Sequence, residues 1–459
     1  MTTVQMLQIP FEETATITES CFINAQIAQK VCISTKKNVP LQAISDNMTF
    51  MPDSIDKISN IPTTKKIRVV DLFAGVGGLS YGFAHDDSFE IVAANEILLP
   101  MATAYSLNHP YVKMYNKDIK DFSIADLSND LGLHKGDIDV VIGGPPCQAY
   151  STVGKRLIDD PRGKLFQEYY RILSELRPKV FIFENVKGLL SMCGGDLIKT
   201  IISLFQSLGY DVNIKVLNAA DYGTPQIRER VILVGTLLGG RFKYPAPTHY
   251  NPEVAVIEGL RPYVTLGEAL SDLPTIANGG KATEYTTEPQ NDYQRLMRTN
   301  HPTVLLDHNV AKNGEHLVRL MQALPDGGSP ADVPEELRPS SGFANCYCRL
   351  WWDRPSTTIT RNLGCVSSSR CVHPKQPRPL STREGARLQG FPDDYQFFGS
   401  RTERNLQIGN AVPTFLSKAI KEAVKAYLSQ NDHGQALPDQ PTTCDKLQQT
   451  KHIERTLFD

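Results

Sequence analysis

The residue best suited to covalent chemistry is Cys147, which follows two glycines and two prolines in the stretch GGPPCQAYS. An isolated cysteine is most often a small core residue, but the prolines argue against burial inside a packed helix or strand. A thiol reacts as its thiolate, which nearby positive charge stabilises. Lys155, Arg156, Arg162 and Lys164 follow in a polar stretch with little apolar periodicity. The sequence therefore predicts a reactive thiol at a strand end, followed by a mobile loop.

A carboxyl group at the end of another apolar run is the second candidate. Glu184 follows four apolar residues in VFIFENV. At the rim of an apolar pocket the pKa of such a carboxyl is raised, so it can donate a proton near neutral pH. Gln226, Arg228 and Arg230 precede the apolar run VILVG. Because alternate residues of a strand point the same way, these three side chains are expected to share one face.

A glycine-rich turn supplies a candidate ligand site. In DLFAGVGGLSYGF, Gly75, Gly77 and Gly78 would let a ligand approach the backbone closely. The dinucleotide fingerprint needs a third glycine at position 80, which is serine, so a pyrophosphate site is disfavoured. Glu96, roughly 20 residues past the glycines, suits a pair of ribose hydroxyls. Asp118 could accept an adenine amino group. Either acid alone could be an ordinary solvated carboxylate in a loop. The glycine turn, Glu96 and Asp118 in this order favour a nucleotide-like ligand.

Short apolar runs ending in Gly, Pro, Asn or Glu alternate with helical patterns between residues 65 and 250. Continuous rather than alternating apolar runs indicate strands that are buried on both faces. Strands that alternate with helices predict an α/β fold with a Rossmann-like, doubly wound, mostly parallel sheet. Ligands of such sheets lie at the carboxyl ends of the strands, where all the motifs above fall.

Composition and apolar pattern divide the chain into five expected segments. Residues 1–64 form a polar N-terminal extension, 65–250 the catalytic domain, and 251–400 a second, smaller and irregular domain rich in Pro, Gly, Thr and Asn. Residues 401–430 return to the catalytic domain, and 431–459 are a polar tail. Within the extension, residues 25–34 faintly resemble a helix-turn-helix, although a short helix or loose extension explains them as well.

Charge and composition exclude several classes of protein. The 48 Lys and Arg against 50 Asp and Glu exclude a uniformly basic coat for nucleic acid, but not a local basic face. No apolar run approaches the roughly 18–20 residues of a membrane span, and the N-terminus lacks a signal-peptide pattern. Nine scattered cysteines, an odd number, indicate reduced thiols and a cytoplasmic protein.

Residues 341–405 carry ten Lys or Arg against five acids, a local charge of +5. This charge suits contacts with phosphates, and the alternative is a solvated charged surface. The basic residues are Arg349, Arg354, Arg361, Arg370, Lys375, Arg378, Arg383, Arg387, Arg401 and Arg404.

Four cysteines in the same part of the chain raise the question of a zinc site. The spacing of Cys346, Cys348, Cys365 and Cys371 contains no C-x₂-C pair, and no histidine stands at zinc-finger spacing. We therefore expect these side chains to pack, and expect no metal.

Together these motifs resemble the S-adenosylmethionine-dependent DNA (cytosine-5)-methyltransferases of bacterial modification systems. The matching stretches are DLFAGVGG, GGPPCQAYS, FENV, QIRERV, RPLSTREGARLQGFPD (378–393) and QIGNAVP (407–413), in the family's order. The resemblance runs from about Arg68 to Pro413. It implies a class I methyltransferase fold in which residues of about 250–375 read the DNA sequence.

The resemblance also implies roles for individual residues. Cys147 would add to carbon 6 of a flipped-out cytosine, and Glu184 would protonate or hydrogen-bond ring nitrogen 3. Arg228 and Arg230 would contact the cytosine oxygen and steady Glu184 or the flipped nucleotide. The S-adenosylmethionine pocket, from which S-adenosylhomocysteine leaves as product, would be lined by Phe73, Gly75, Val76, Gly77, Gly78, Leu79, Glu96, Ile97, Asp118, Ile119, Pro146, Leu165, Asn410 and Val412.

The implied substrate is double-stranded DNA, methylated at a specific sequence. We expect a monomer in the bacterial cytoplasm with no membrane contact, and a cognate restriction endonuclease that shares the site without forming a stable complex. One alternative is a transfer-RNA cytosine-5 methyltransferase, although the Cys-Phe-Thr stretch of that branch is absent. The other is a DNA-binding regulator that has lost catalysis, although every catalytic residue type is present.

Overall fold

The computed structural model describes residues 65–146, 165–300, 302–340, 342 and 345–434. Three of the sequence expectations fall outside these residues. They are the N-terminal extension with its helix-turn-helix-like patch, Cys147 with the basic stretch that follows it, and nearly all of the polar tail.

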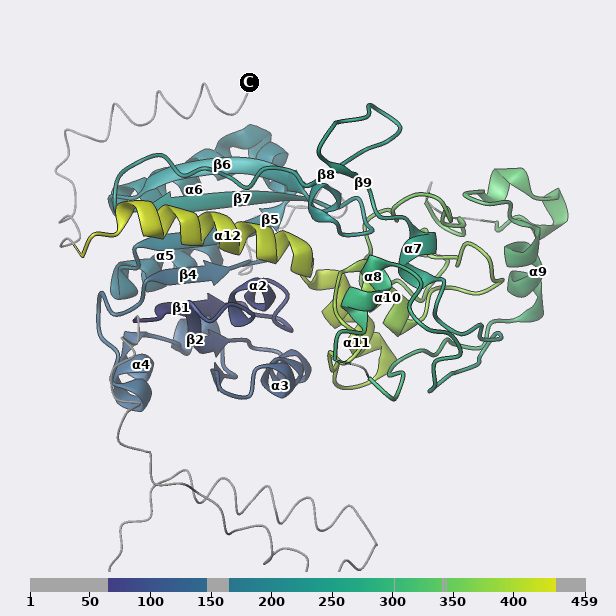
Figure 1. Cartoon of the computed structure of the whole chain (residues 1–459), viewed down its shortest axis with the longest axis horizontal. Coiled ribbons are helices and arrows are strands. Elements are labelled where there is room, and N and C mark those ends of the chain that lie inside the picture. Colours follow the sequence, from purple (N-terminus) through teal and green to yellow (C-terminus); the bar gives the residue numbers. More distant parts are fainter. Residues whose placement is uncertain (1–64, 147–164, 301, 341, 343–344, 435–459) are drawn as a thin grey trace, which may run out of the picture. The chain divides into compact units, whose positions relative to one another are not determined.

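A seven-stranded sheet organises the catalytic part of the chain (Figure 1). Its spatial order is β3-β2-β1-β4-β5-β7-β6, and β7 alone runs antiparallel to its neighbours. The predicted doubly wound, mostly parallel sheet is therefore confirmed. The strands are β1 (Ile67–Leu72), β2 (Phe89–Asn95), β3 (Lys113–Tyr115), β4 (Val140–Gly143), β5 (Val180–Val186), β6 (Asp211–Asn218) and β7 (Glu229–Thr236).

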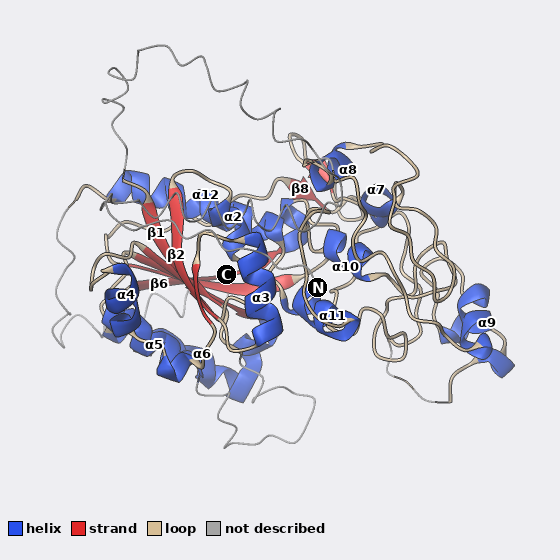
Figure 2. Cartoon of the chain, turned by 90° about the horizontal axis from the view of Figure 1, so that it is seen from below, coloured by secondary structure: helices blue, strands red, loops and turns tan. Residues whose placement is uncertain are grey.

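Helices cover both faces of this sheet, as Figure 2 shows. One face packs against α5 (Leu165–Leu176) and α6 (Asp196–Ser207), with α4 (Ile124–Leu131) beside them. The other packs against α2 (Ser80–Ala84) and α12 (Thr414–Asn431), and α3 (Leu99–Asn108) follows β2. Alternate strand residues enter opposite cores, which explains the continuous apolar runs. Short 3₁₀ helices are η3 (Ile119–Asp121), η6 (Lys187–Gly195) and η7 (Ala219–Tyr222).

An 18-residue window within residues 187–207 has a mean hydropathy of 1.4 and a length that could cross a membrane, contrary to the expectation that no apolar run reaches that length. The segment is not one continuous helix, because Met192, Cys193 and Gly194 break it between η6 and α6. Ile198, Ile201 and other apolar residues of α6 are buried against the sheet. Its hydrophobicity is therefore that of a core helix.

Residues 251–400 are built mainly from loops and short helices, as their composition predicted. Apolar residues of these helices form a second core, which also includes Val76 and Met101 of the catalytic part. The proposed domain boundaries at 250, 400 and 430 stay predictions. The elements are β8 (His249–Tyr250), β9 (Arg261–Pro262), α7 (Leu266–Leu270), α8 (Asp292–Met297), α9 (Glu315–Ala323), η8 (Pro330–Asp332), η9 (Glu335–Leu337), α10 (Thr382–Leu388) and α11 (Arg401–Asn410).

Four of the ten basic residues between 341 and 405 are buried and cannot contact phosphate, so the expectation is wrong for them. Arg387 is fully buried between Asp272 and Asp393, and Arg378 donates two hydrogen bonds of 2.8 and 2.7 Å to Glu384. Arg349 and Arg383 donate to backbone carbonyls. Buried guanidinium groups compensate their desolvation with such partners. The basic charge here stabilises loops that have little regular secondary structure.

Helix α12 returns to the catalytic part by crossing α2 at a glycine. A Cβ atom on Gly82 would lie 2.6 Å from the carbonyl carbon of Ser417. The Gly82 N–H donates to Ser417 Oγ at 2.9 Å. This backbone-to-backbone approach leaves no space for a side chain at position 82.

We predict that Gly82→Ala lowers the free energy of unfolding. The gain in helix propensity, about 0.5–1 kcal/mol, is smaller than the roughly 1–3 kcal/mol of overpacking. Urea unfolding followed by circular dichroism measures the difference. Gly188→Ala is the control, because its Cβ would come no closer than 3.9 Å to any atom. A stabilised Gly82→Ala protein would contradict the packing of α12 on α2.

Candidate active site

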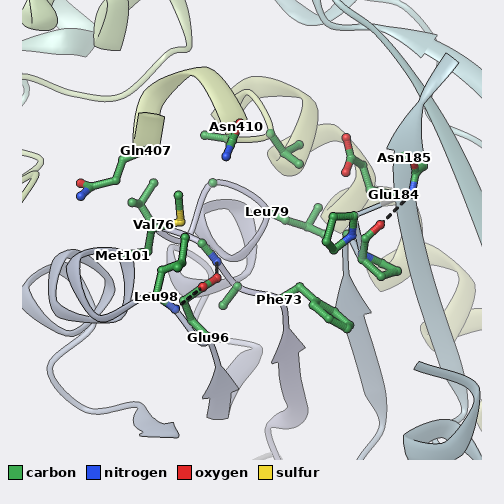
Figure 3. A pocket seen from close by; sticks show the side chains of 18 of the residues that line it. Phe73, Val76, Leu79, Glu96, Leu98, Met101, Glu184, Asn185, Gln407 and Asn410 are labelled. Carbon is green, nitrogen blue, oxygen red and sulfur yellow. Dashed lines mark hydrogen bonds between the residues drawn. The ribbon is translucent and has the colours of Figure 1, made fainter. Parts of the chain in front are cut away.

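A cavity of about 880 Å³ opens at the carboxyl ends of β1, β2, β4 and β5. Of the residues predicted to bind the cofactor, all except Gly77 line it. So do three of the four predicted catalytic residues, Glu184, Arg228 and Arg230; Cys147 lies outside the described residues, directly after the lining residue Pro146. Figure 3 shows Glu96 and Glu184 at opposite ends of this cavity.

The glycine turn between β1 and α2 forms one wall. Gly75 has a φ of +57°, and a Cβ there would meet no atom within 4 Å, so bare backbone faces the cavity. At Gly78 a Cβ would lie 2.4 Å from the carbonyl oxygen of Val412, which brings the C-terminal segment against the turn. Gly77 faces away from the cavity, toward His109 and Tyr395. Gly77 and Gly78 thus allow other parts of the chain to approach the turn closely, whereas Gly75 leaves its backbone open to the cavity.

Glu96 directly follows β2, and its carboxylate accepts hydrogen bonds from the backbone. One oxygen accepts from the Gly75 N–H at 2.9 Å and the other from the Leu98 N–H at 2.8 Å. Burial raises the pKa of Glu96, and these N–H groups oppose that rise. Asp118, after β3, accepts from the Lys120 N–H at 3.1 Å. Both acids therefore lie at the cavity with fixed orientations, suited to hydroxyl and amino groups.

Asp71 is a lining residue that the sequence analysis did not select. Its carboxylate accepts a hydrogen bond from Ser80, whose hydroxyl lies 2.9 Å from that of Tyr105. Burial raises the pKa of Asp71 to about 8, so the carboxyl group is mainly protonated at neutral pH. An acid near the end of an apolar strand is costly to bury. That cost was the signal in the sequence that could have identified it.

Glu184 lies at the far end of the cavity, on β5. Its Oε1 is 2.9 Å from Arg230 Nε on the adjacent strand β7. Glu184 pairs with Ile232 in the antiparallel register, so Arg230 is its diagonal neighbour on the same face. Burial raises the pKa of Glu184, and the positive charges of Arg230 and Arg228 oppose that rise. The carboxyl is therefore a candidate proton donor, as its position in the sequence predicted.

The segment that precedes Cys147 contacts this acid directly. A Cβ on Gly144 would lie 2.7 Å from Glu184 Oε2, so a side chain at this position would displace the carboxyl group of Glu184. The Asn185 side chain donates to the Pro145 carbonyl at 2.9 Å (Figure 3). These contacts fix the Gly-Pro-Pro turn at the end of β4 beside Glu184.

Arg228 makes different contacts from those expected. Its guanidinium group donates to the carbonyls of Ile359 and Gly409, both at 2.8 Å. Within the described part of the chain, the ion pair of Glu184 is with Arg230 and not with Arg228. Ile359 belongs to the segment 358–361, which also lines the cavity. Arg228 thus joins β7 to the second region and to α11. Sequence alternation placed it correctly on one face but could not identify these partners.

We predict that Arg228→Met destabilises the protein by about 2–4 kcal/mol, because two buried carbonyls lose their donor. Arg230→Met should cost much less, because Glu184, whose pKa is raised by burial, can take up a proton when its partner is removed. Urea unfolding of the two variants makes the comparison. Equal stability of both variants would show that Arg228 does not hold the two regions together.

Comparison with known proteins identifies a family for this arrangement. The model for C-5 cytosine-specific DNA methylases matches residues 67–426. Type II methyltransferase M.AgeI of Thalassovita gelatinovora is 34% identical over 434 residues, which cover 79% of this chain and all of that protein. M.DdeI of Desulfomicrobium norvegicum is 36% identical, covering 79% of this chain and 89% of that protein.

Solved structures show the same fold. A putative DNA modification methyltransferase of an E. coli prophage aligns with a TM-score of 0.64 at 24% identity, over 79% of this chain and all of that one. The family match spans the sheet, the cavity and the returning helix α12. The chain therefore belongs to the C-5 cytosine-specific DNA methylase family and is a DNA (cytosine-5)-methyltransferase.

Proposed function

We propose that this enzyme methylates one cytosine within a specific duplex DNA sequence, with Cys147 as nucleophile and Glu184 as proton donor. One observation carries the proposal: a single cavity joins a glycine turn and Glu96 at one end to Glu184, Arg230 and the Gly-Pro-Pro turn before Cys147 at the other. A methyl donor and a base can therefore meet inside it.

The cavity suits S-adenosylmethionine. Its volume of about 880 Å³ lies within the range of small-ligand sites. Glu96 and Asp118 offer acceptors for hydroxyl and amino groups, and bare backbone at Gly75 permits close approach. When bound, S-adenosylmethionine supplies an electrophilic methyl group on a sulfonium. Phe73, Leu79 and Val412 would provide apolar contacts, and Asn410 a polar one.

The residues of the chain would activate the base in a defined order. The Cys147 thiolate adds to carbon 6 while Glu184 gives a proton to, or shares it with, ring nitrogen 3. Carbon 5 then becomes an enamine carbon, nucleophilic enough to accept the methyl group. Loss of the carbon 5 proton expels the thiolate and restores the aromatic ring. Arg230 keeps Glu184 oriented and can reach the cytosine oxygen.

Stacked bases are inaccessible to these groups, so the target cytosine must leave the duplex. Thr358, Thr360 and Arg361 of the second region line the same cavity. We assign residues of about 250–375 to sequence reading on this ground. The names of the relatives as Type II methyltransferases support a role in protecting host DNA in the bacterial cytoplasm against an endonuclease with the same site. That the enzyme acts as a monomer stays a prediction.

We predict that Cys147→Ser abolishes methyl transfer but not DNA binding, because serine is a far weaker nucleophile at neutral pH. Duplex DNA with 5-fluorocytosine at the target should trap a covalent complex, since the proton at carbon 5 is replaced. Denaturing gels and peptide mass spectrometry detect it.

Cys365→Ser is the control for this experiment. Cys365 is an exposed thiol whose pKa is lowered by hydrogen bonds with Ser367 and Ser368, so it is a plausible competitor in reactivity. It should retain full activity and trapping. Trapping that survives Cys147→Ser, or is lost with Cys365→Ser, would refute the assignment of the nucleophile.

We predict that activity falls as pH rises through the raised pKa of Glu184, because the protonated form is the donor. Arg230→Met removes the positive charge that lowers this pKa. The alkaline limb of single-turnover rate against pH should therefore move to higher pH, although the maximal rate falls. Lys187→Met, which removes an exposed ion pair with Glu229, should leave the limb in place. An unmoved or lowered limb for Arg230→Met would refute the role of Glu184.

A further inference from the structure

The glycine turn of the cavity is held from behind by a residue of the second region. The hydroxyl of Tyr395, which follows the motif ending at Asp393, donates a hydrogen bond to the carbonyl of Val76. Tyr395 is buried, and Val76 lines the cavity on the other side. Through this hydrogen bond, the second region contacts the turn on the side opposite to the ligand site.

Gly77 allows this contact. It has a φ of +88°, and a Cβ there would lie 2.6 Å from His109 Nε2 and 3.0 Å from the Tyr395 hydroxyl oxygen. The His109 Nε2 is 3.4 Å from that hydroxyl oxygen. The two rings fill the space behind the turn, which explains why Gly77 does not line the cavity although its neighbours do.

Tyr395 is itself fixed in position. Gln396, the next residue, donates its N–H to Asn108 Oδ1 at 2.9 Å, and Asn108 Nδ2 donates to the Gln396 carbonyl at 2.8 Å. Arg383 donates to the Tyr395 carbonyl at 3.0 Å. The hydroxyl is thus presented to Val76 from a segment bonded both to α3 and to the second region.

Among the described residues, two side chains hydrogen-bond to the backbone of the turn at 74–78: Glu96 at Gly75 and Tyr395 at Val76. Glu96 faces the ligand site, where the proposed function assigns it to ribose hydroxyls. Tyr395 approaches from the opposite side and contacts no ligand. Burial raises the pKa of Tyr395 well above its ordinary value and lowers the pKa of His109 to about 4, so both rings are neutral at physiological pH.

We propose that Tyr395 is a positioning residue for the methyl donor: by holding the Val76 carbonyl it fixes the glycine turn in its binding geometry, so that the second region tunes cofactor affinity. This inference rests on the proposed function, because it assumes that S-adenosylmethionine binds against this turn. The loss of one buried hydrogen bond sets the expected size of the effect, about three- to tenfold in affinity.

Tyr395→Phe tests the proposal, because it removes only the hydroxyl. The dissociation constant of S-adenosylhomocysteine, measured by calorimetry on the full chain, should rise about three- to tenfold. In steady-state kinetics KM for S-adenosylmethionine should rise in parallel, while kcat and KM for DNA stay unchanged. A loss of folded protein would lower the active fraction and kcat without changing KM.

Tyr293→Phe is a matched control. Tyr293 is also buried in the second core, and its hydroxyl also donates to a backbone carbonyl, that of Arg387, which does not line the cavity. This variant should lose similar stability but bind S-adenosylhomocysteine as the wild type does. An unchanged affinity in Tyr395→Phe, or an equal loss in both variants, would overturn the inference. Failure of the wild type to bind S-adenosylhomocysteine would instead overturn the proposed function.

Discussion

The arrangement of the site depends on one carboxyl group, Glu184, that is taken out of water yet kept within reach of an arginine. Burial favours its protonated form, and the ion pair with Arg230 limits that preference. The antiparallel strand β7 makes this possible, because it places Arg230 diagonally across from Glu184 on the same face. The sheet's departure from all-parallel pairing therefore serves the chemistry at its carboxyl edge.

Close approaches of backbone bring the remaining parts to this carboxyl. Gly144 lets the turn before Cys147 pass Glu184, and Gly78 brings the turn after β1 against Val412. A Cβ on Gly409 would lie 2.1 Å from the Arg361 nitrogen, so α11 and the segment 358–361 also meet without side chains between them. Parts of the chain that are far apart in sequence thus form a single cavity, in which the cofactor end and the base end share walls.

The sequence predicted most of the sheet, since its buried strands are short apolar runs that end in distinctive residues. It did not predict β6, because this strand mixes polar and apolar residues. β6 lies at the edge of the sheet, where it pairs with a strand on one side only. The residues at the cavity were recognised from motifs, but Gly77 shows the limit of that method. Gly77 belongs to the same motif as Gly75 and Gly78. It faces away from the cavity, however, toward His109 and Tyr395, which come from elsewhere in the chain.

Charge was the least predictable property. The sequence predicted a basic surface that included Arg378, Arg383 and Arg387. Each of these side chains is instead buried, and it contacts carboxylate or carbonyl groups that only the fold brings near. Arg228 likewise holds two carbonyls rather than the predicted acid. Asp71, buried in β1, was passed over because its partner Ser80 lies in α2 and the next hydroxyl group, that of Tyr105, lies in α3. Local patterns identify residue types at strand ends, whereas partners across the chain decide what a charged group does.

The central claim is that this cavity transfers methyl groups to carbon 5 of cytosine in DNA at a defined sequence. Bisulfite sequencing of genomic DNA from bacterial cells that express the chain tests it most directly. The account predicts protected cytosines at one recurring duplex sequence, absent from cells that carry an empty vector. Fully converted DNA from cells with abundant folded protein, or methylated cytosine confined to their transfer RNA, would contradict it.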